Sequence, residues 1–139
     1  MAVKAFLDAN VILDLFLQRD DFANSEMIVE LIINGHVKGY VTSSVVHIVG
    51  YWTTKYLNSS TAKEMLLRLL TDVTVIDIHH EVVLQALHSA VDDIEDGLQY
   101  YTALYHNLDY FITRDKVLLK QGIPSLPIIS PGDFLEIIS

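Results

Sequence analysis

The stretch that decides the fold runs from residue 4 to residue 14 and reads KAFLDANVILD. Its apolar run stops at Asp8, and apolar residues recur at helical spacing from Val11 onward. This pattern predicts a first strand that delivers Asp8 to a strand-to-helix turn. Ligands of open α/β sheets bind beyond the carboxyl ends of the strands, so an acid at such a turn is placed to face a site.

Two later segments place further acids in similar positions. Residues 110–115, which read YFITRD, predict another apolar strand that ends on an acid, and residues 92–96 form an acidic cluster at the start of a helix. Acids at a helix start commonly serve only the helix dipole, and that interpretation would suffice for the cluster alone. Strand ends and helix starts share one side of a parallel sheet, however, so we expect the acids of all three segments to converge around a metal ion.

The rest of the chain alternates predicted strands with predicted helices. We expect strands over residues 3–8, 39–42, 73–76, 110–113 and 126–129, the last at a sheet edge because of Pro127. The alternation indicates a three-layer α/β fold with a central parallel sheet, and the lack of a Pro/Gly/Ser-rich linker indicates a single domain over residues 1–139. On the helix over residues 94–107, the apolar spacing predicts a sheet-facing stripe of Ile94, Leu98, Tyr101, Tyr105 and Leu108.

Composition narrows the class of protein. Hydrophobic residues make up 51% of the chain and the mean hydropathy is +0.34, which suits a buried parallel sheet, and no apolar run approaches the ~20 residues of a membrane span. We therefore expect no membrane segment, and because the chain starts directly with a predicted strand we expect no leader. The absence of cysteine excludes disulfides and thiolate metal sites and fits a cytoplasmic setting. The net charge of −9 argues against purely electrostatic binding of nucleic acid, although bound cations would reverse the local potential at a metal site.

The predicted ligand set contains only carboxylate oxygens, which favours Mg²⁺ or Mn²⁺ over zinc. Such an ion suits phosphodiester hydrolysis, because it lowers the pKa of bound water and stabilises the departing oxygen. The sequence contains no glycine-rich phosphate loop, nucleophile elbow or cysteine that would indicate another chemistry.

Residues 7–14, 93–104 and 111–115 resemble, in that order, the defining segments of the PIN-domain family. The resemblance implies a small α/β fold and Mg²⁺- or Mn²⁺-dependent ribonuclease activity, as in the VapC-type toxins of bacterial toxin–antitoxin pairs. It also implies that Asp8, Asp96 and Asp115 are the catalytic metal ligands, and we hold Asp93 as a further catalytic candidate.

The same resemblance implies contacts with RNA and with other proteins. We assign Asn10, Ser44, Thr113 and Arg114 to substrate binding, although Arg114 could equally be an ordinary surface charge. An antitoxin that supplies Arg or Lys to the acids, and a homodimer, are expected by analogy with the family. A predicted apolar patch offers a surface for such partners and consists of Tyr51, Trp52 and Tyr56.

The chain departs from the family pattern in one place. The family usually carries a further acid, most often Glu, in the helix after Ser44, and here residues 45–50 read VVHIVG. His47 is the only polar candidate, and we interpret it as a packed residue bonded to backbone, the commoner state of a lone histidine on an apolar helix. The departure leaves open a catalytically silent module that binds RNA or protein. A phosphatase acting on small phosphoesters is a weaker alternative, because Asn10 stands where a second Asp would be expected.

Overall fold

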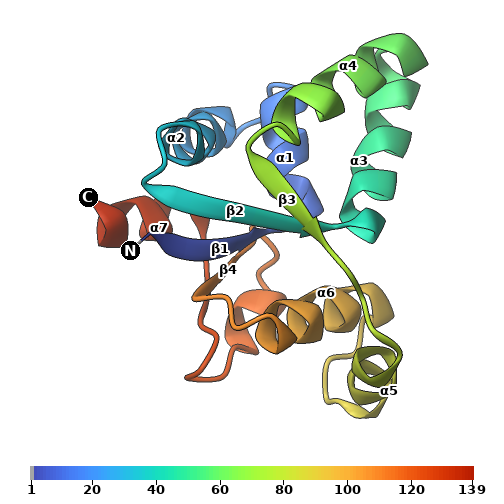
Figure 1. Cartoon of the computed structure of the whole chain (residues 1–139), viewed down its shortest axis with the longest axis vertical. Helices are drawn as coiled ribbons and strands as arrows, with labels where there is room; N and C mark the ends of the chain where they lie inside the picture. Colours follow the sequence, from blue (N-terminus) through green and yellow to red (C-terminus); the bar gives the residue numbers. More distant parts are fainter. Residues whose placement is uncertain (1) are drawn as a thin grey trace.

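The computed structural model of the protein describes residues 2–139, and within that range five parallel strands form one sheet between layers of helices (Figure 1). The order across the sheet is β3-β2-β1-β4-β5, with short β5 at an edge, as predicted. This arrangement confirms the predicted α/β class and the central parallel sheet. The strands are β1 (Val3–Leu7), β2 (Val37–Thr42), β3 (Val73–Ile76), β4 (Tyr110–Ile112) and β5 (Ile128–Ile129).

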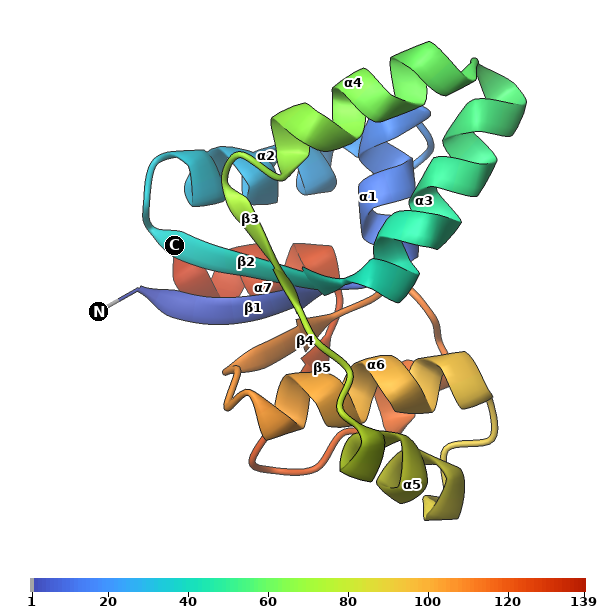
Figure 2. The same cartoon turned by 45° about the vertical axis from the view of Figure 1, so that its right-hand side comes forward.

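The helices form the two outer layers. Helices α1 to α4 lie on one face of the sheet and α5 and α6 on the other (Figures 1 and 2), while α7 packs alongside α2. In the part of the chain that the structure describes, no helix is both long and apolar enough to cross a membrane. The helices are α1 (Ala9–Phe16), α2 (Phe22–Ile33), α3 (Ser43–Tyr56), α4 (Ser59–Leu69), α5 (His80–His88), α6 (Ile94–Tyr105), the 3₁₀ helix η1 (Leu118–Lys120) and α7 (Pro131–Ile138).

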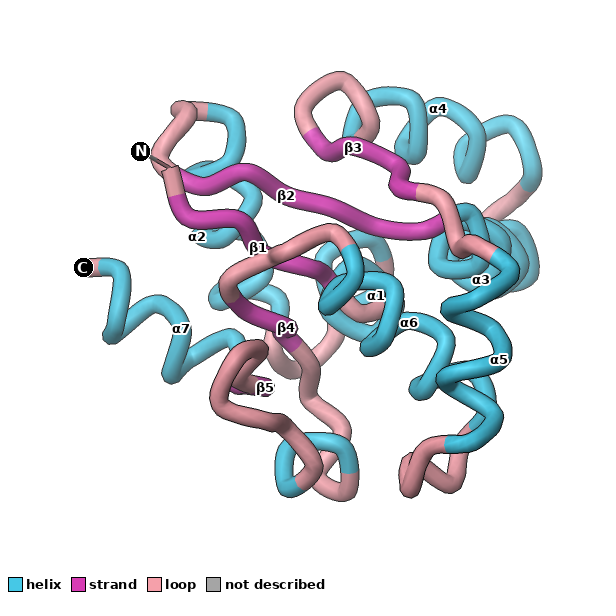
Figure 3. The backbone as a smooth tube through the Cα atoms, turned by 60° about the horizontal axis from the view of Figure 1, so that its bottom comes forward, coloured by secondary structure: helices cyan, strands magenta, loops and turns pink. Residues whose placement is uncertain are grey.

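The path of the chain through the sheet reverses between β1 and β4. The chain moves outward from β1 to β2 and β3, then crosses back through α5 and α6 to add β4 on the other side of β1 (Figure 3). Such a reversal is the position where open α/β sheets bind their ligands. The register pairs Leu7 with Ile112, so Asp8 and Thr113 leave the sheet side by side at this point.

The core explains why the central strands read as continuous apolar runs. Phe6 and Phe111, from adjacent strands, are both fully buried, and their rings stack with centroids 4.9 Å apart. Helices cover both sides of these strands, so each strand buries side chains on both faces.

The predicted sheet-facing stripe of α6 was wrong at two positions, Ile94 and Tyr105, whereas Leu108 lies in the core and Tyr101 packs against it. Ile94 and Tyr105 are 64% and 55% exposed, whereas Tyr100 and Ala103 are buried. The physical reason is that α6 packs against α5 as well as against the sheet: a Cβ added at Gly97 would lie 3.5 Å from the Cβ of Ala86. A helix with two covered sides carries apolar residues on both, and periodicity alone does not tell which side meets the sheet.

The hydroxyl group of Tyr100 fixes the loop between η1 and β5 to α6. It donates a hydrogen bond to the carbonyl oxygen of Leu126 at 2.7 Å and accepts one from the backbone N–H of Ile123 at 3.0 Å. The Tyr100 side chain is 1% exposed, so water does not readily replace these bonds.

Tyr100→Phe should therefore lower the free energy of unfolding by about 1–2 kcal/mol, because it leaves the buried carbonyl oxygen of Leu126 and the part-buried N–H of Ile123 without this partner. Urea denaturation followed by circular dichroism measures this change. Tyr101→Phe is the matched control, since the neighbouring hydroxyl forms none of these bonds, and it should change the stability by less than about 0.5 kcal/mol. Equal effects of the two substitutions would contradict the role assigned to Tyr100.

Candidate metal centre

Asp8 ends β1 and caps α1. One carboxylate oxygen, Oδ1, accepts a hydrogen bond from the backbone N–H of Ala9 at 2.8 Å, and the other, Oδ2, accepts one from the hydroxyl of Thr113 at 2.7 Å. Asp8 is only 9% exposed and Thr113 is fully buried. The two side chains thus join the carboxyl ends of β1 and β4 and fix the orientation of the Asp8 carboxylate.

Asp115 belongs to the same network. Its backbone N–H donates to the Thr113 hydroxyl oxygen at 3.1 Å, so this one hydroxyl serves both acids. The Oδ1 atom of Asp115 accepts bonds from the backbone N–H groups of Val117 and Leu118 at 2.9 and 3.2 Å, which hold the turn after β4. The half-buried Asp115 is therefore placed by local backbone geometry.

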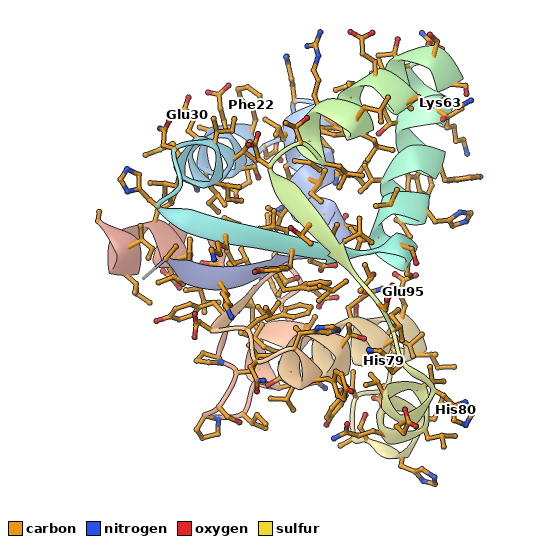
Figure 4. All side chains as sticks on the ribbon, viewed as in Figure 1. Phe22, Glu30, Lys63, His79, His80 and Glu95 are labelled. Carbon is orange, nitrogen blue, oxygen red and sulfur yellow. The ribbon has the colours of Figure 1, made fainter. Side chains whose placement is uncertain are left out.

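The third segment contributes Asp93 and Asp96 at the start of α6. Asp93 is the N-cap, and its Oδ1 accepts a hydrogen bond from the backbone N–H of Asp96 at 2.9 Å. Asp93 is exposed and Asp96 is half-buried. Glu95, which lies between these two acids in the sequence, is found near the starts of α6 and α3 (Figure 4).

The electrostatics show that these acids are neighbours. Burial, and then the negative charges of Asp93, Asp8, Asp115 and Glu95, raise the pKa of Asp96 to about 7. Burial also raises the pKa of Asp8, with smaller increases from Asp115 and Asp93, while the hydrogen bonds from Thr113 and Ala9 lower it. The structure therefore brings together the predicted group of Asp8, Asp93, Asp96 and Asp115, which we call the acid cluster. Their binding of a metal ion stays a prediction.

The chemistry of the acid cluster fits a hard divalent cation. Among the described residues, no ion pair joins a Lys or Arg side chain to any member of the cluster. Neighbouring carboxylates without a counter-charge repel one another, as the raised pKa of Asp96 indicates, and a cation would remove that repulsion. Within residues 2–139, no three acidic or histidine side chains are already arranged to hold a metal ion, so binding would require side-chain rotation.

The predicted substrate-binding residues have different surroundings, and their contact with RNA stays a prediction. Asn10 is exposed at the start of α1, and Ser44 is half-buried in the first turn of α3. Thr113 already uses its hydroxyl for Asp8 and Asp115, as described above. Arg114 is directed to a different carboxylate, that of Asp14.

The interpretation of His47 as a packed residue was wrong. His47 is exposed, because α3 buries Val45 and Val49 on the opposite flank. Burial, and then the charges of Asp93 and Asp8, raise the pKa of Glu95, and the nearby His47 offsets a small part of that rise. His47 thus stands beside the acid cluster, where the family usually has an acid.

Asp14 ends the stretch that decides the fold, but the sequence alone did not indicate a structural or functional role for it. It is completely buried, and its Oδ1 accepts hydrogen bonds from Nη2 of Arg114 at 2.8 Å and from Nε of Arg19 at 3.1 Å. The Nε atom of Arg114 also contacts the other oxygen, Oδ2. The available signal was spacing: Asp14 lies one helical turn after Val11, on the buried face of α1.

A buried polar pair between α3 and α6 was also missed. Thr42, the N-cap of α3, forms a hydrogen bond with the side chain of Gln99, and both residues are at most 2% exposed. This pair ties the start of α3, and with it His47, to the helix that carries Asp96. A glutamine between apolar residues of a predicted helix was the only sequence signal.

A model of the family described as PIN domain matches residues 4–117, which is most of the chain. The chain belongs to the PIN-domain family. A search of curated proteins gave no match.

Several solved structures share the PIN fold of this chain. VapC20 from Mycobacterium tuberculosis, described as a sarcin–ricin loop cleaving toxin, has a TM-score of 0.69 at 13% identity, covering 88% of this chain and 98% of its own. PAE2754 from Pyrobaculum aerophilum has a TM-score of 0.69 at 18% identity, and the match covers 99% of this chain and 96% of PAE2754. A chain of VapBC2 from Rickettsia felis, in a structure bound to promoter DNA, has a TM-score of 0.67 at 17% identity. The match covers 92% of this chain and 98% of that chain. At these low sequence identities, the structural similarity shows only that the proteins share a fold.

The raised pKa of Asp96 predicts a pH dependence of stability in the presence of a chelator. The folded protein holds the Asp96 proton more tightly than the unfolded chain does, so this group favours folding at low pH and loses that effect as the pH rises toward about 7. Asp96→Asn should therefore raise the melting temperature at about pH 8, and the gain should shrink at about pH 5.

Thermal melts of both proteins at the two pH values measure this difference. Asp20→Asn is the control, because it removes an exposed acid outside the cluster and should follow the native protein at both pH values. A gain that stays constant with pH would contradict an electrostatic origin in the raised pKa of Asp96.

Proposed function

We propose that the protein is a Mg²⁺- or Mn²⁺-dependent endoribonuclease and the toxin component of a toxin–antitoxin pair. The observation that carries the proposal is the acid cluster, which three separate segments bring to the switch point of the sheet without a Lys or Arg partner among the described residues. Membership of the PIN-domain family and the fold shared with VapC20 support the same activity.

In this proposal Asp8, Asp96 and Asp115 hold the metal ion. The ion, when bound, would supply an activated water and stabilise the departing oxygen of the phosphodiester. Thr113 fixes the Asp8 carboxylate, and the cap formed by Asp93 fixes the backbone at Asp96. Without compensation of their charge, these carboxylates would repel the phosphodiester of an RNA substrate.

Asp8→Asn and Asp96→Asn should each lower the rate of RNA cleavage with Mn²⁺. The loss should exceed the roughly 10- to 100-fold that changes to the outer shell of a metal site cost, because each substitution removes a proposed direct ligand. Cleavage of total RNA and of hairpin oligonucleotides, followed on gels, measures the rate.

Two controls accompany this assay. A chelator should abolish cleavage. Asp72→Asn should leave it unchanged, because Asp72 is an exposed acid at the amino-terminal end of β3, whereas the acid cluster lies beyond the carboxyl ends of the strands. Cleavage that persists in Asp8→Asn, or in the presence of the chelator, would contradict the proposed metal chemistry.

The proposed protein partners are an antitoxin and a second copy of the chain. The acid cluster offers a site for a basic side chain from an antitoxin. On α3, Tyr51, Trp52 and Tyr56 are 55%, 37% and 65% exposed, and the ring of Trp52 packs against both neighbours. This aromatic surface is apolar enough to serve as an interface.

A catalytically silent module that binds RNA or protein is the second candidate. The observation that favours it is His47, which occupies the side of the cluster where the family usually places an acid. Glu95, whose pKa is raised by burial and by the charges of Asp93 and Asp8, lies near His47 and could replace that acid.

His47→Glu separates the two candidates. The exposed side chain lies beside the cluster, so a carboxylate there should strengthen Mn²⁺ binding by about tenfold and raise the rate of RNA cleavage. Thr54→Glu is the matched control, because it adds the same charge to an exposed position about two turns further along α3. If the native protein is inactive and only His47→Glu cleaves RNA, the silent module is the better description. A native protein that already cleaves RNA supports the nuclease.

A further inference from the structure

The arginine closest in sequence to the acid cluster does not contact the cluster. Arg114 directly precedes Asp115 in the turn after β4, yet its guanidinium group binds Asp14 on α1. A flexible cation next to a group of unpaired carboxylates would normally be drawn to them. Some feature of the structure must therefore hold Arg114 in its observed position.

Asp14 has the properties needed to hold Arg114. It is completely buried, and a buried carboxylate requires a cationic partner. Arg114 donates one hydrogen bond to Oδ1 through Nη2 at 2.8 Å, and its Nε forms an ion pair with Oδ2, so its guanidinium charge lies against both oxygens. Arg19 reaches only Oδ1 through its Nε and uses Nη2 for the Asn10 side chain at 3.3 Å. Arg114 is thus the principal partner of Asp14.

The pair belongs to a set of contacts that fix the turn after β4 to α1. Thr113 donates to Asp8 at the start of α1, and Arg114 donates to Asp14 further along the same helix. The next residue, Asp115, donates its backbone N–H back to Thr113. The three consecutive residues therefore have different partners, and the Asp115 carboxylate, which accepts from the backbone N–H groups of Val117 and Leu118, is the one that belongs to the acid cluster.

We propose that Asp14 is a positioning residue of the metal centre, which holds the Arg114 cation away from the acid cluster so that an external divalent ion can bind there. The inference rests on the proposed function. If Asp14 loses its charge, Arg114 is released and competes with the metal ion for the carboxylates. Removing Arg114 as well removes the competitor, so metal binding should return.

A purely structural role for Asp14 makes a different prediction. If the ion pair only stabilises the turn after β4, loss of Asp14 would disorder Asp115, and the further loss of Arg114 would not restore metal binding. Rescue by the second substitution therefore distinguishes the two roles. Because binding of the metal is measured without RNA, the result does not depend on catalysis.

The experiment is a titration of the metal-free protein with Mn²⁺, followed by calorimetry and by the electron paramagnetic resonance of free Mn²⁺. Asp14→Asn should weaken Mn²⁺ binding by at least about tenfold, in the range that supporting residues of metal sites cost. The double variant Asp14→Asn/Arg114→Met should bind within about threefold of the native protein, and Arg19→Met alone should do the same.

A matched pair keeps the test decisive if Asp14→Asn alone does not fold. Asp14→Asn/Arg114→Met and Asp14→Asn/Arg19→Met each remove the buried acid and one of its arginines, but only the first removes the cation next to the cluster. The first should bind Mn²⁺ at least about tenfold more tightly than the second. Equal affinities of this pair, or a folded Asp14→Asn with native affinity, would overturn the inference. Absence of Mn²⁺ binding in the native protein would instead overturn the proposed function, and the inference with it.

Discussion

The hydrogen bond from Thr113 to Asp8 joins the two strands on which the rest of the site depends. Strands β1 and β4 are far apart in the sequence and become neighbours only because the chain reverses its direction across the sheet. At their carboxyl ends, a hydroxyl group between two acids sets the orientation of one side chain and receives the backbone N–H of the other. The position of the candidate site is therefore a consequence of topology, and the buried Thr113 sets the geometry where β1 and β4 end.

The acid cluster has an unfavourable electrostatic energy in the absence of a cation. Burial and mutual repulsion raise the pKa of Asp8 and Asp96, so the folded chain holds charges in a place where water and counter-charges compensate them poorly. The apolar core of stacked and buried side chains must offset this cost. Such local destabilisation is common where a protein binds a ligand, because the ligand restores the missing compensation.

The positions of Asp8 and Asp115 after β1 and β4 could be predicted from simple rules, while their role in metal binding stays a prediction. An apolar run that ends on an acid predicts a strand end, and parallel strands bring such ends to one side of the sheet, as Asp8 and Asp115 show. The rotation of α6 and the exposure of His47 did not follow from the sequence, because periodicity gives the angle between residues and not the direction of the neighbouring layer. Asp14 was missed because its partner, Arg114, lies 100 residues away and only the fold brings them together.

The two groups of buried or half-buried acids differ in how their charge is compensated. Asp14 receives two arginines from within the chain, and breaking such a pair by removing one partner costs about 3–5 kcal/mol in typical proteins. The acid cluster receives none from the described residues, although Arg114 is the immediate neighbour of one of its members. Arg19 and Arg114 thus compensate the buried carboxylate of Asp14. The acid cluster is left for an ion from solution. In a chain of net charge −9, this division is what could give a divalent cation one preferred place among many acidic side chains.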